Sequence, residues 1–453
     1  MDKSMKLQLP QAVTKIINKI EEAGFEAYAV GGCVRDTLLS RTPDDWDITT
    51  SATPGQIKKL FKRTIDTGIA HGTVTVLLDH VGYEVTTYRI DGEYEDARHP
   101  KEVTYTKELS EDLRRRDFTI NAMAYNPRTG IIDLFQGMED LEAGIVKAVG
   151  EPRERFTEDA LRMMRAVRFC AQLGYRLDEE TAKAIQELSG NLDKISKERI
   201  QVELIKLVTS PHPEQMRELY RLGITAVIMP EFDAVMETEQ NNPHHKYSVG
   251  EHIIHSMMAV RPNKVLRLAM LFHDFGKPSC KTVDEEGIDH FHGHGAESEK
   301  LCKKILRGLK FDNDTIYMVS RLVLYHDHQV EPGKKYVRRA INRLGEDVFP
   351  LLLEVKQADL AAQSDYEKEK KEEHLCKIRQ LYEEILKDRE CVKLSDLAVK
   401  GADLMGWGME PGKQIGQILE ALLEEVLEDP GLNTKESLYE LYLKYRGGQQ
   451  EKS

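Results

Sequence analysis

The sequence predicts an α+β protein, with a small mixed β-sheet near the N-terminus and helices in the rest of the chain. Two observations support this fold class. Short apolar or alternating runs that are typical of strands, such as residues 26–30 (EAYAV) and 71–79 (HGTVTVLLD), occur only before about residue 150. Beyond that point, apolar residues recur at helical spacing almost to the C-terminus.

The N-terminal elements follow one another at short intervals. An amphipathic helix is expected at residues 11–24, where a glycine ends the pattern, and a buried strand at 26–30. The further elements expected in this part are a Gly-Gly turn at 31–32, a helix at 34–39, and strands at 47–50, 71–79 and 83–90.

Glycine and proline breaks divide the helical part into modules, near Pro211 and Pro213, at 241–246 and at 331–335. The charged run at 365–374 (DYEKEKKEEH) is interpreted as a solvated helix face or a connector. The predicted divisions of the chain are 1–148 for the mixed part and 149–240, 241–365 and 366–453 for three helical parts.

The composition fits a soluble globular protein of several domains, because the chain has 453 residues, 31% of them charged and 40% hydrophobic. No apolar run reaches membrane-spanning length and the N-terminus lacks the apolar core of a signal peptide, so no membrane partner and a cytoplasmic location are expected. The formal net charge of −13 disfavours a nucleic-acid partner for the chain as a whole. Arginines nevertheless gather at 114–116 and 153–168, which predicts one concentrated basic region.

Asp45 and Asp47 flank Trp46 inside a run that is expected to form a short strand. In an extended chain, residues two apart project to the same face, so both carboxylates would point together. Two such charges repel each other unless they are solvated or a divalent cation lies between them. The residues alone leave two interpretations open, a metal site or an acidic surface turn with a capping aspartate.

The segment 30–36 (VGGCVRD) lies between an expected strand and an expected helix. Gly31 and Gly32 let the backbone approach a phosphate closely, and the N-terminus of a helix favours anions. Arg35 could add charged hydrogen bonds to the same phosphate. Because Asp45 and Asp47 follow shortly afterwards, the two features together predict phosphoryl or nucleotidyl transfer.

Residues 30–54 (VGGCVRDTLLSRTPDDWDITTSATP) resemble the signature of the class II tRNA nucleotidyltransferases, the CCA-adding enzymes and their poly(A) polymerase relatives. Five later motifs extend the resemblance in order: 67–76 (TGIAHGTVTV), 91–100 (DGEYEDARHP), 114–124 (RRRDFTINAMA), 158–169 (EDALRMMRAVRF) and 195–200 (ISKERI). The resemblance implies a DNA polymerase beta-like nucleotidyltransferase head with a small mixed sheet, followed by a helical neck that binds nucleotide and RNA.

The resemblance implies a metal role for three carboxylates. Asp45 and Asp47 would bind two Mg²⁺ ions, which would activate the RNA 3′-hydroxyl and stabilise the departing pyrophosphate. Glu84, in the expected strand at 83–90, is the candidate for a third catalytic carboxylate. The alternative for Glu84 is an exposed strand residue without a catalytic role.

The same resemblance implies nucleotide contacts for residues of the turn and of the arginine triplet. Gly32 and Arg35 would hold the triphosphate. Arg116 would lie beside the incoming nucleotide, and Asp117 resembles the family's ribose-contacting residue, which would favour ribonucleotides.

Asp159, Arg162 and Arg165 are spaced three residues apart and would form one polar flank of a helix, with Arg168 one step further along. Cytosine and adenine both present an amino donor beside a ring-nitrogen acceptor, which a carboxylate and a guanidinium can recognise. Uracil and guanine present the reverse order, so Asp159 and Arg162 would select C and A without a nucleic-acid template. The alternative is an ordinary helix stabilised by weak i,i+3 ion pairs.

A second group of metal-ligand residue types lies at 244–360. Imidazoles and carboxylates that converge from several helices suit a divalent transition metal, which can activate water. The series resembles the HD-domain phosphohydrolases, which implies phosphodiesterase or phosphatase activity in the part at 241–365. The residues that match its ligand core are His252, His273, Asp274 and Asp359, with His294 and His326 at accessory positions and His255 as a rival for the first ligand.

The predicted function is template-independent addition of C, C and A to tRNA 3′ ends, with ATP and CTP as substrates, tRNA as partner and Mg²⁺ as cofactor, plus an HD phosphohydrolase activity. The alternatives are a poly(A) polymerase, a relative that adds only CC or only A, and a metal phosphohydrolase that merely binds RNA. The C-terminal part, 366–453, resembles the tRNA-anchoring tail of CCA-adding enzymes. The oligomeric state is left open.

Overall fold

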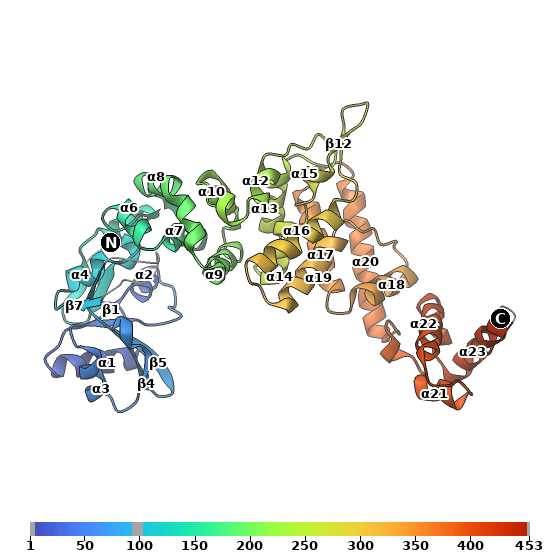
Figure 1. Ribbon diagram of the computed structural model, residues 1–453, viewed down its shortest axis with the longest axis horizontal. Coiled ribbons are helices and arrows are strands. Elements are labelled where there is room, and N and C mark those ends of the chain that lie inside the picture. The colour runs from blue at the N-terminus through green and yellow to red at the C-terminus, as the bar shows by residue number, and fades with distance from the viewer. Residues whose placement is uncertain (1–4, 93–102, 451–453) are drawn as a thin grey trace. The chain divides into compact units, whose positions relative to one another are not determined.

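The computed structural model describes residues 5–92 and 103–450 (Figure 1). It divides into two compact units. The first comprises residues 1–233 with 308–311, and the second comprises residues 234–307 with 312–453. The expected loop motif at 91–100 lies almost entirely outside the described residues.

The first unit is built on a mixed sheet of seven strands among the described residues, in the order β3-β4-β5-β2-β1-β8-β9. These strands are β1 (Ala27–Val30), β2 (Ile48–Thr50), β3 (Thr64–Gly68), β4 (Thr73–Leu78), β5 (Val81–Thr87), β8 (Met123–Asn126) and β9 (Gly130–Asp133). The expected strand at 83–90 is split, because β5 ends at Thr87 and β6 (Arg89–Asp91) pairs instead with β7 (Val103–Tyr105).

The parallel pairing of β2 with β5 positions the acidic residues of this sheet. Ile48 is paired with Val85, so Asp47, just before β2, lies near Glu84 of β5. The prediction that Asp45 and Asp47 lie inside a strand is wrong, because β2 begins only at Ile48. A bend at Asp44 precedes them, although the Asp47 carbonyl still accepts a hydrogen bond from Val30 N, 3.0 Å away.

Helices cover this sheet and continue beyond it. The helices of the first unit are α1 (Gln11–Glu22), α2 (Gly32–Leu38), α3 (Pro54–Leu60), α4 (Leu109–Arg114), α5 (Gly137–Ala143), α6 (Pro152–Glu158), α7 (Leu161–Leu173), α8 (Glu179–Leu188), α9 (Lys197–Val208), α10 (Met216–Arg221) and α11 (Thr225–Ile228). In α1 the buried residues Val13, Ile16, Ile17 and Ile20 recur at i, i+3, i+4 and i+7, and this face packs on β1.

The second unit is almost entirely helical. Its helices are α12 (Glu231–Met236), in which the division falls, α13 (Val249–Ala259), α14 (Lys264–Phe272), α15 (Lys277–Cys280), α16 (His294–Gly308), α17 (Asn313–Tyr325), α18 (Lys334–Leu344), α19 (Phe349–Ala362), α20 (Lys368–Asp388), α21 (Gly401–Gly406), α22 (Lys413–Glu428) and α23 (Lys435–Gln450). The expectation of no strand after about residue 150 is wrong in detail. Two-residue strands occur at β11 (Arg176–Leu177), which pairs with β10 (Ile145–Val146), and at β12 (Thr282–Val283) and β13 (Asp289–His290).

The core of the second unit surrounds α14, in which every residue from Leu266 to Phe272 is buried. α13, α17 and α19 pack around it. Within the described residues, no helix combines the length and the apolar character that a membrane span requires.

The C-terminal helices are joined to the rest of this unit by a buried arginine. Arg338 of α18 donates hydrogen bonds to the carbonyls of Leu427 (2.7 Å) and Glu428 (2.9 Å) at the end of α22. Its guanidinium also pairs with Glu390 at 2.5 Å. A cation at this end of α22 satisfies carbonyls that have no partner within the helix and suits the helix dipole.

Candidate active sites

The turn between β1 and α2 depends on glycine at one position. Gly31 has a φ of 85°, which side chains rarely allow, and a Cβ atom there would lie 2.9 Å from Nη1 of Arg116. The helix begins at Gly32, two residues earlier than the sequence predicted. The turn therefore brings the arginine triplet against the backbone at the N-terminus of α2.

The three candidate catalytic carboxylates are near one another but lack internal compensation. Asp45 and Glu84 are exposed and Asp47 is half-buried. Burial raises the pKa of Asp47 to about 6, with repulsion from Asp45 and Glu84 adding to it and Arg116 opposing it. A group of oxygen ligands that repel one another, with one face open to solvent, fits a divalent cation such as Mg²⁺.

Asp112 anchors the arginine triplet from below. Its carboxylate is completely buried and accepts hydrogen bonds from Arg115 Nη2 (2.6 Å) and from Thr49 Oγ1 of β2 (3.0 Å). Arg116 Nη2 is 3.6 Å from the same carboxylate. Burial opposes ionisation of Asp112, but the two arginines outweigh it and lower its pKa. This buried network holds Arg116 in place relative to β2, the strand that follows Asp47.

A cavity of about 290 Å³ lies next to this network, within the first unit. It is lined by Arg115, Arg116, Asp117, Asp159, Leu161, Arg162, Arg165 and Arg199. Five of these are residues that the sequence assigned to nucleotide binding. Arg116 is the lining residue whose positive charge also acts on Asp47, where it opposes the rise in pKa.

Asp159 lies at a break between two helices, and the prediction that it sits on the same helix as Arg162 is wrong. Its backbone is extended (φ −143°, ψ 102°) and ends α6, and α7 begins at Leu161. Asp159 Oδ1 accepts a hydrogen bond from Leu161 N (3.1 Å), and Oδ2 accepts one from Arg199 Nη2 (2.7 Å). Short acidic side chains often cap a helix start in this way, which ends the preceding helix.

Arg162 remains beside Asp159 on the cavity wall. Its guanidinium pairs with Glu158 at 2.6 Å and donates to the Arg115 carbonyl at 3.0 Å. Asp117 is held by Arg165, whose Nε and Nη2 lie 2.9 and 2.5 Å from Asp117 Oδ2. Burial opposes ionisation of Asp117, but Arg165 outweighs it and the pKa of this carboxyl lies well below its usual range.

Two predicted nucleotide-binding residues face the protein interior. Arg168 is buried, its Nε lies 2.6 Å from Glu203 of α9, and burial lowers its pKa to about 10 although Glu203 opposes this. Arg35 is 8% exposed and donates to Asn121 Oδ1 at 2.6 Å. Among the lining residues of the cavity, Arg115 and Arg199 received no role from the sequence, although both lie in quoted motifs.

In the second unit, five of the six predicted metal ligands gather around the sixth, Asp274. We call them the His–Asp cluster: His252, His273, Asp274, His294, His326 and Asp359. Oδ2 of Asp274 is 3.3 Å from His273 Nε2 and 3.6 Å from His252 Nε2, and Oδ1 is 3.4 Å from His294 Nε2 and 3.7 Å from His326 Nε2. Asp359 Oδ1 completes the first group, 2.8 Å from His252 Nε2.

Backbone contacts orient the imidazoles of this cluster. Nδ1 of His273, His294 and His326 lies 2.6 to 2.8 Å from a carbonyl three residues earlier on its own helix or turn. These contacts make Nδ1 the donor in His273, His294 and His326, so their Nε2 atoms carry lone pairs. The Nε2 atoms are 3.2 Å apart for His252 and His273 and 3.1 Å apart for His294 and His326. Ring nitrogens this close to one another and to Asp274 fit a divalent metal ion in both groups.

Opposite charges surround the carboxylates of the cluster. Lys277 Nζ is 2.7 Å from Asp274 Oδ2. Burial opposes ionisation of Asp274 and Asp359, but His273 and Lys277 for the former, and His252 for the latter, lower the pKa of each carboxyl. Burial likewise opposes protonation of His273, yet Asp274 and Asp359 raise its pKa.

Of the two candidates for the first ligand, His252 lies in the cluster and His255 does not. His255 lies one turn along α13 and stacks on Tyr247, with ring centroids 4.1 Å apart. His245, which received no role from the sequence, lies with its ring centroid 5.0 Å from that of His252, and its buried Nδ1 has no hydrogen-bond partner in the structure. An adjacent pair of histidines, at 244 and 245, was the only available signal.

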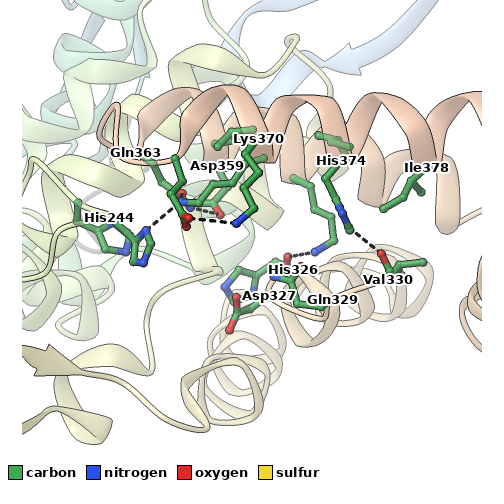
Figure 2. A pocket seen from close by; sticks show the side chains of 16 residues that line it. His244, His326, Asp327, Gln329, Val330, Asp359, Gln363, Lys370, His374 and Ile378 are labelled. Atoms are coloured by element: carbon green, nitrogen blue, oxygen red, sulfur yellow. Dashed lines mark hydrogen bonds and ion pairs between the residues drawn. The ribbon is translucent and has the colours of Figure 1, made fainter. Parts of the chain in front are cut away.

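Two cavities adjoin the cluster inside the second unit. The larger, about 490 Å³, which we call the α20 cavity, is shown in Figure 2. It is lined by His244, His245, His326, Asp327, Gln329, Val330, Lys356, Asp359, Leu360, Gln363, Glu367, Lys370, Lys371, His374, Leu375 and Ile378. The second, about 310 Å³, which we call the hairpin cavity, is lined by Asn242, His244, His245, Asp274, Lys277, Phe291, His292, Gly293, His294, His326, Asp327, Asp359 and Gln363.

Three family models match the chain. Their descriptions are "Poly A polymerase head domain" for residues 27–147, "Probable RNA and SrmB- binding site of polymerase A" for residues 174–236, and "tRNA nucleotidyltransferase domain 2" for residues 294–442. The last match covers part of the region that the sequence assigned to an HD domain.

Curated relatives match about half of the chain. A CCA-adding enzyme of Leuconostoc mesenteroides is 52% identical over 215 residues, which are 47% of this chain and 54% of the relative. A CCA-adding enzyme of Lactiplantibacillus plantarum is 54% identical over 209 residues, 46% of this chain and 51% of the relative. The chain thus spans about half the length of these curated relatives.

Solved structures extend the likeness over the whole chain. The Bacillus stearothermophilus CCA-adding enzyme in complex with CTP has a TM-score of 0.74 and 28% identity, covering 98% of this chain and all of that one (100%). The Thermotoga maritima CCA-adding enzyme complexed with tRNA shares the fold at a TM-score of 0.59 and 20% identity over 96% of this chain and 95% of that one. The chain is therefore similar to the CCA-adding enzymes, and its N-terminal part matches the poly(A) polymerase head domain.

Proposed function

We propose that this protein is an enzyme that adds C, C and A to the 3′ end of tRNA, using CTP and ATP and no nucleic-acid template. The observation that carries the proposal is the position of Arg116. Its positive charge acts on Asp47, its Nη1 lies 2.9 Å from where a Cβ atom of residue 31 would be, and it lines the cavity together with Asp159 and Arg162. A nucleotide whose base lies in that cavity would place its phosphates between the glycine turn and the carboxylates.

The carboxylates of Asp45 and Asp47, with Glu84 beside them, would hold Mg²⁺. Bound there, the metal supplies a Lewis acid that activates the RNA 3′-hydroxyl and neutralises charge on the pyrophosphate. Arg116 would add a guanidinium to the triphosphate, supported from behind by Asp112. The amides at the N-terminus of α2, including that of Gly32, would complete the anion site.

Base selection would rest on Asp159 and Arg162. In the structure, Asp159 Oδ2 is held by Arg199 and Arg162 by Glu158, so each side chain is already oriented at the cavity wall. The second lone pair of each carboxylate oxygen and the remaining N–H groups of the guanidinium can meet the amino group and ring nitrogen of C or A. Asp117, clamped by Arg165, would orient the ribose.

The test is incubation of tRNA that lacks its 3′ end with Mg²⁺ and each ribonucleotide, separately and with CTP and ATP together, followed by sequencing of the extended ends. The proposal predicts two C residues from CTP alone, a single A after them when ATP is also present, and no incorporation of U or G. A run of A residues would favour a poly(A) polymerase, and CC alone or A alone would favour a partial-activity relative. No incorporation with any nucleotide would refute nucleotidyl transfer and leave an RNA-binding phosphohydrolase.

A second function is favoured by the His–Asp cluster. We propose that it binds divalent transition metal ions and hydrolyses a phosphoester, as its resemblance to HD-domain phosphohydrolases implies. Four imidazoles and the buried Asp274 carboxylate form two groups of possible ligands, with Asp359 beside them, and the metal would supply a nucleophilic water near neutral pH. Chelation followed by metal add-back, assayed on a 2′,3′-cyclic phosphate and on phosphomonoesters, tests it. Absence of metal-dependent turnover on every phosphoester would leave the cluster with a structural role.

A further inference from the structure

The His–Asp cluster lies where the α20 cavity and the hairpin cavity meet. Six residues line both cavities: His244, His245, His326, Asp327, Asp359 and Gln363. Two of these, His326 and Asp359, belong to the cluster itself. A phosphate held by the cluster would therefore have open space on two sides.

The wall of the α20 cavity is one face of a helix. The residues of α20 that line the cavity lie on one face of the helix, at spacings of three and four (Figure 2). They are Lys370, Lys371, His374, Leu375 and Ile378, and Glu367, just before the helix, lines the cavity with them. Four buried apolar residues also line it: Val330, Leu360, Leu375 and Ile378. An apolar wall with a polar rim, in a volume of about 490 Å³, suits a flat ring with hydroxyl or phosphate substituents.

Hydrogen bonds connect this wall to the cluster. Asp359 Oδ1 lies 2.8 Å from His252 Nε2, and its Oδ2 accepts a hydrogen bond from Gln363 Nε2 at 3.0 Å. Gln363 Oε1 in turn accepts from Lys371 Nζ at 2.9 Å, and Lys371 Nζ lies 3.0 Å from Nδ1 of His244. The chain of contacts fixes the cavity wall in position relative to the ligands.

Charged side chains of both signs line the cavity, and ammonium groups lie close to the cluster. Three lysines line it, Lys356, Lys370 and Lys371, against the carboxylates of Asp327 and Glu367 and that of Asp359, a cluster residue. Lys356 donates to the His326 carbonyl at 2.7 Å, which places an ammonium group directly behind that ligand. In the hairpin cavity, Lys277 adds a further cation beside Asp274.

We propose that the cluster takes a linear nucleoside phosphodiester, with one nucleoside in the α20 cavity and the other in the hairpin cavity. The inference rests on the hydrolase function proposed for the cluster. A phosphomonoester has a single organic substituent, and a 2′,3′-cyclic phosphate carries both ester bonds on one ribose, so either would fill one cavity only. A linear diester has two separate substituents and occupies both.

The reaction would be a hydrolysis. An oxygen from water bonds to phosphorus, the P–O bond to one ribose breaks, and that ribose leaves as a hydroxyl that carries a proton from the water. The other nucleoside keeps the phosphate as a monoester. One water molecule is consumed, and no oxidant, reductant or other reactant is needed.

The experiment compares three probes with the full-length protein: the dinucleoside monophosphate ApA, adenosine 2′,3′-cyclic phosphate and AMP, each with Mn²⁺, Ni²⁺ or Co²⁺. The expected result is a kcat/KM for ApA at least about tenfold above that for the other two, in accord with the discrimination that one filled subsite provides. Lys370→Glu should reduce the ApA value about tenfold. Its matched control is Lys377→Glu, the same charge change at an exposed position of α20 outside the cavity, which should leave it unchanged.

Binding of ApA to EDTA-treated protein, measured by calorimetry, gives a readout that needs no turnover. Wild type and Lys377→Glu should bind alike, and Lys370→Glu about tenfold more weakly. Equal or faster cleavage of the cyclic phosphate or AMP, or equal ApA binding by all three proteins, would overturn the inference. If no probe is cleaved, the hydrolase function is wrong, and the ApA affinities alone decide on the binding site. Weaker ApA binding only in Lys370→Glu would then support the two-sided diester site. Equal ApA binding by all three proteins would refute it.

Discussion

The carboxylates of the first unit and those of the His–Asp cluster lie in opposite electrostatic surroundings. Asp47 lies near Asp45 and Glu84, and burial and their repulsion raise its pKa to about 6 although Arg116 opposes this. Asp274 lies against Lys277 and four imidazoles, and its pKa is lowered despite complete burial. The first site therefore needs an external cation for its acidic groups to be ionised together, whereas the second carries its own positive charge and can hold protons where a metal would bind.

The largest effect is expected from removal of a proposed Mg²⁺ ligand. Asp45→Ala should lower incorporation of CTP and ATP by at least about a thousandfold, because no other side chain compensates for a lost metal ligand. Asp44→Ala is the matched control, since Asp44 is an exposed neighbour at the bend. Single-turnover incorporation into truncated tRNA measures both, and equal activity of the two variants would contradict the metal role of Asp45.

A second comparison concerns stability without metal. Asp274→Asn should destabilise the EDTA-treated protein by about 3 kcal/mol at pH 7, because Lys277 and His273 would be left buried without their counter-charge. Hydrogen exchange of α13 and α14 measures the change where it is expected. Unchanged protection in these helices would show that the cluster does not balance its own charge.

The pair formed by Asp117 and Arg165 should make the first unit sensitive to acid. Because the folded pKa of Asp117 is lowered, its stabilisation is present above the unfolded value of about 3.9 and disappears as the pH falls through and below it. Asp117→Asn should cost about 2 kcal/mol at pH 7 and progressively less as the pH falls below about 3.9. Urea unfolding across this range measures it, and a constant difference at every pH would contradict the ion pair.

Base choice should respond to the residues at the cavity wall. Arg162→Ala should lower discrimination of C and A against U and G by about tenfold, since one hydrogen-bonding contact is lost. Exchange of Asp159 and Arg162 should loosen or alter the choice while metal binding in the head is retained. Competition assays with mixed nucleotides measure both, and strict addition of C and A by the exchanged variant would refute the protein-template mechanism.

The smallest expected effect has the opposite sign to that at Asp274. Since burial and repulsion raise the folded pKa of Asp47, ionisation at neutral pH costs free energy in metal-free protein. Asp47→Asn should therefore stabilise EDTA-treated protein by about 1 kcal/mol at pH 8, and the gain should vanish below about pH 4. If Asp47→Asn destabilised the metal-free protein, the claim that ionised Asp47 is unfavourable without a metal ion would be contradicted.

The sequence predicted the elements that depend on local pattern. The mixed sheet, the first helix and the glycine turn follow from apolar periodicity and from the demand for a positive φ at Gly31. The cluster was predicted from an ordered series of His and Asp residues, and the structure brings the other five residues together around Asp274.

Other features depend on contacts between residues distant in sequence. The break at Asp159 could not be anticipated from three-residue spacing, because it follows from the capping of α7 and from Arg199, forty residues later. The inward orientation of Arg168 depends on Glu203 of the next long helix. The sequence did not predict that α20 forms a cavity wall, because its N-terminal part reads as a charged run. The cavity forms only where the residues around Val330 and Leu360 pack opposite this helix.

The most direct measurement assays both reactions on the same preparations: incorporation of CTP and ATP into tRNA lacking its 3′ end, and metal-dependent cleavage of ApA. Asp45→Ala should abolish incorporation and leave cleavage intact, whereas Asp274→Asn should abolish cleavage and leave incorporation intact. Loss of both reactions in either folded variant, or retention of incorporation in Asp45→Ala, would contradict two separate sites with separate chemistry.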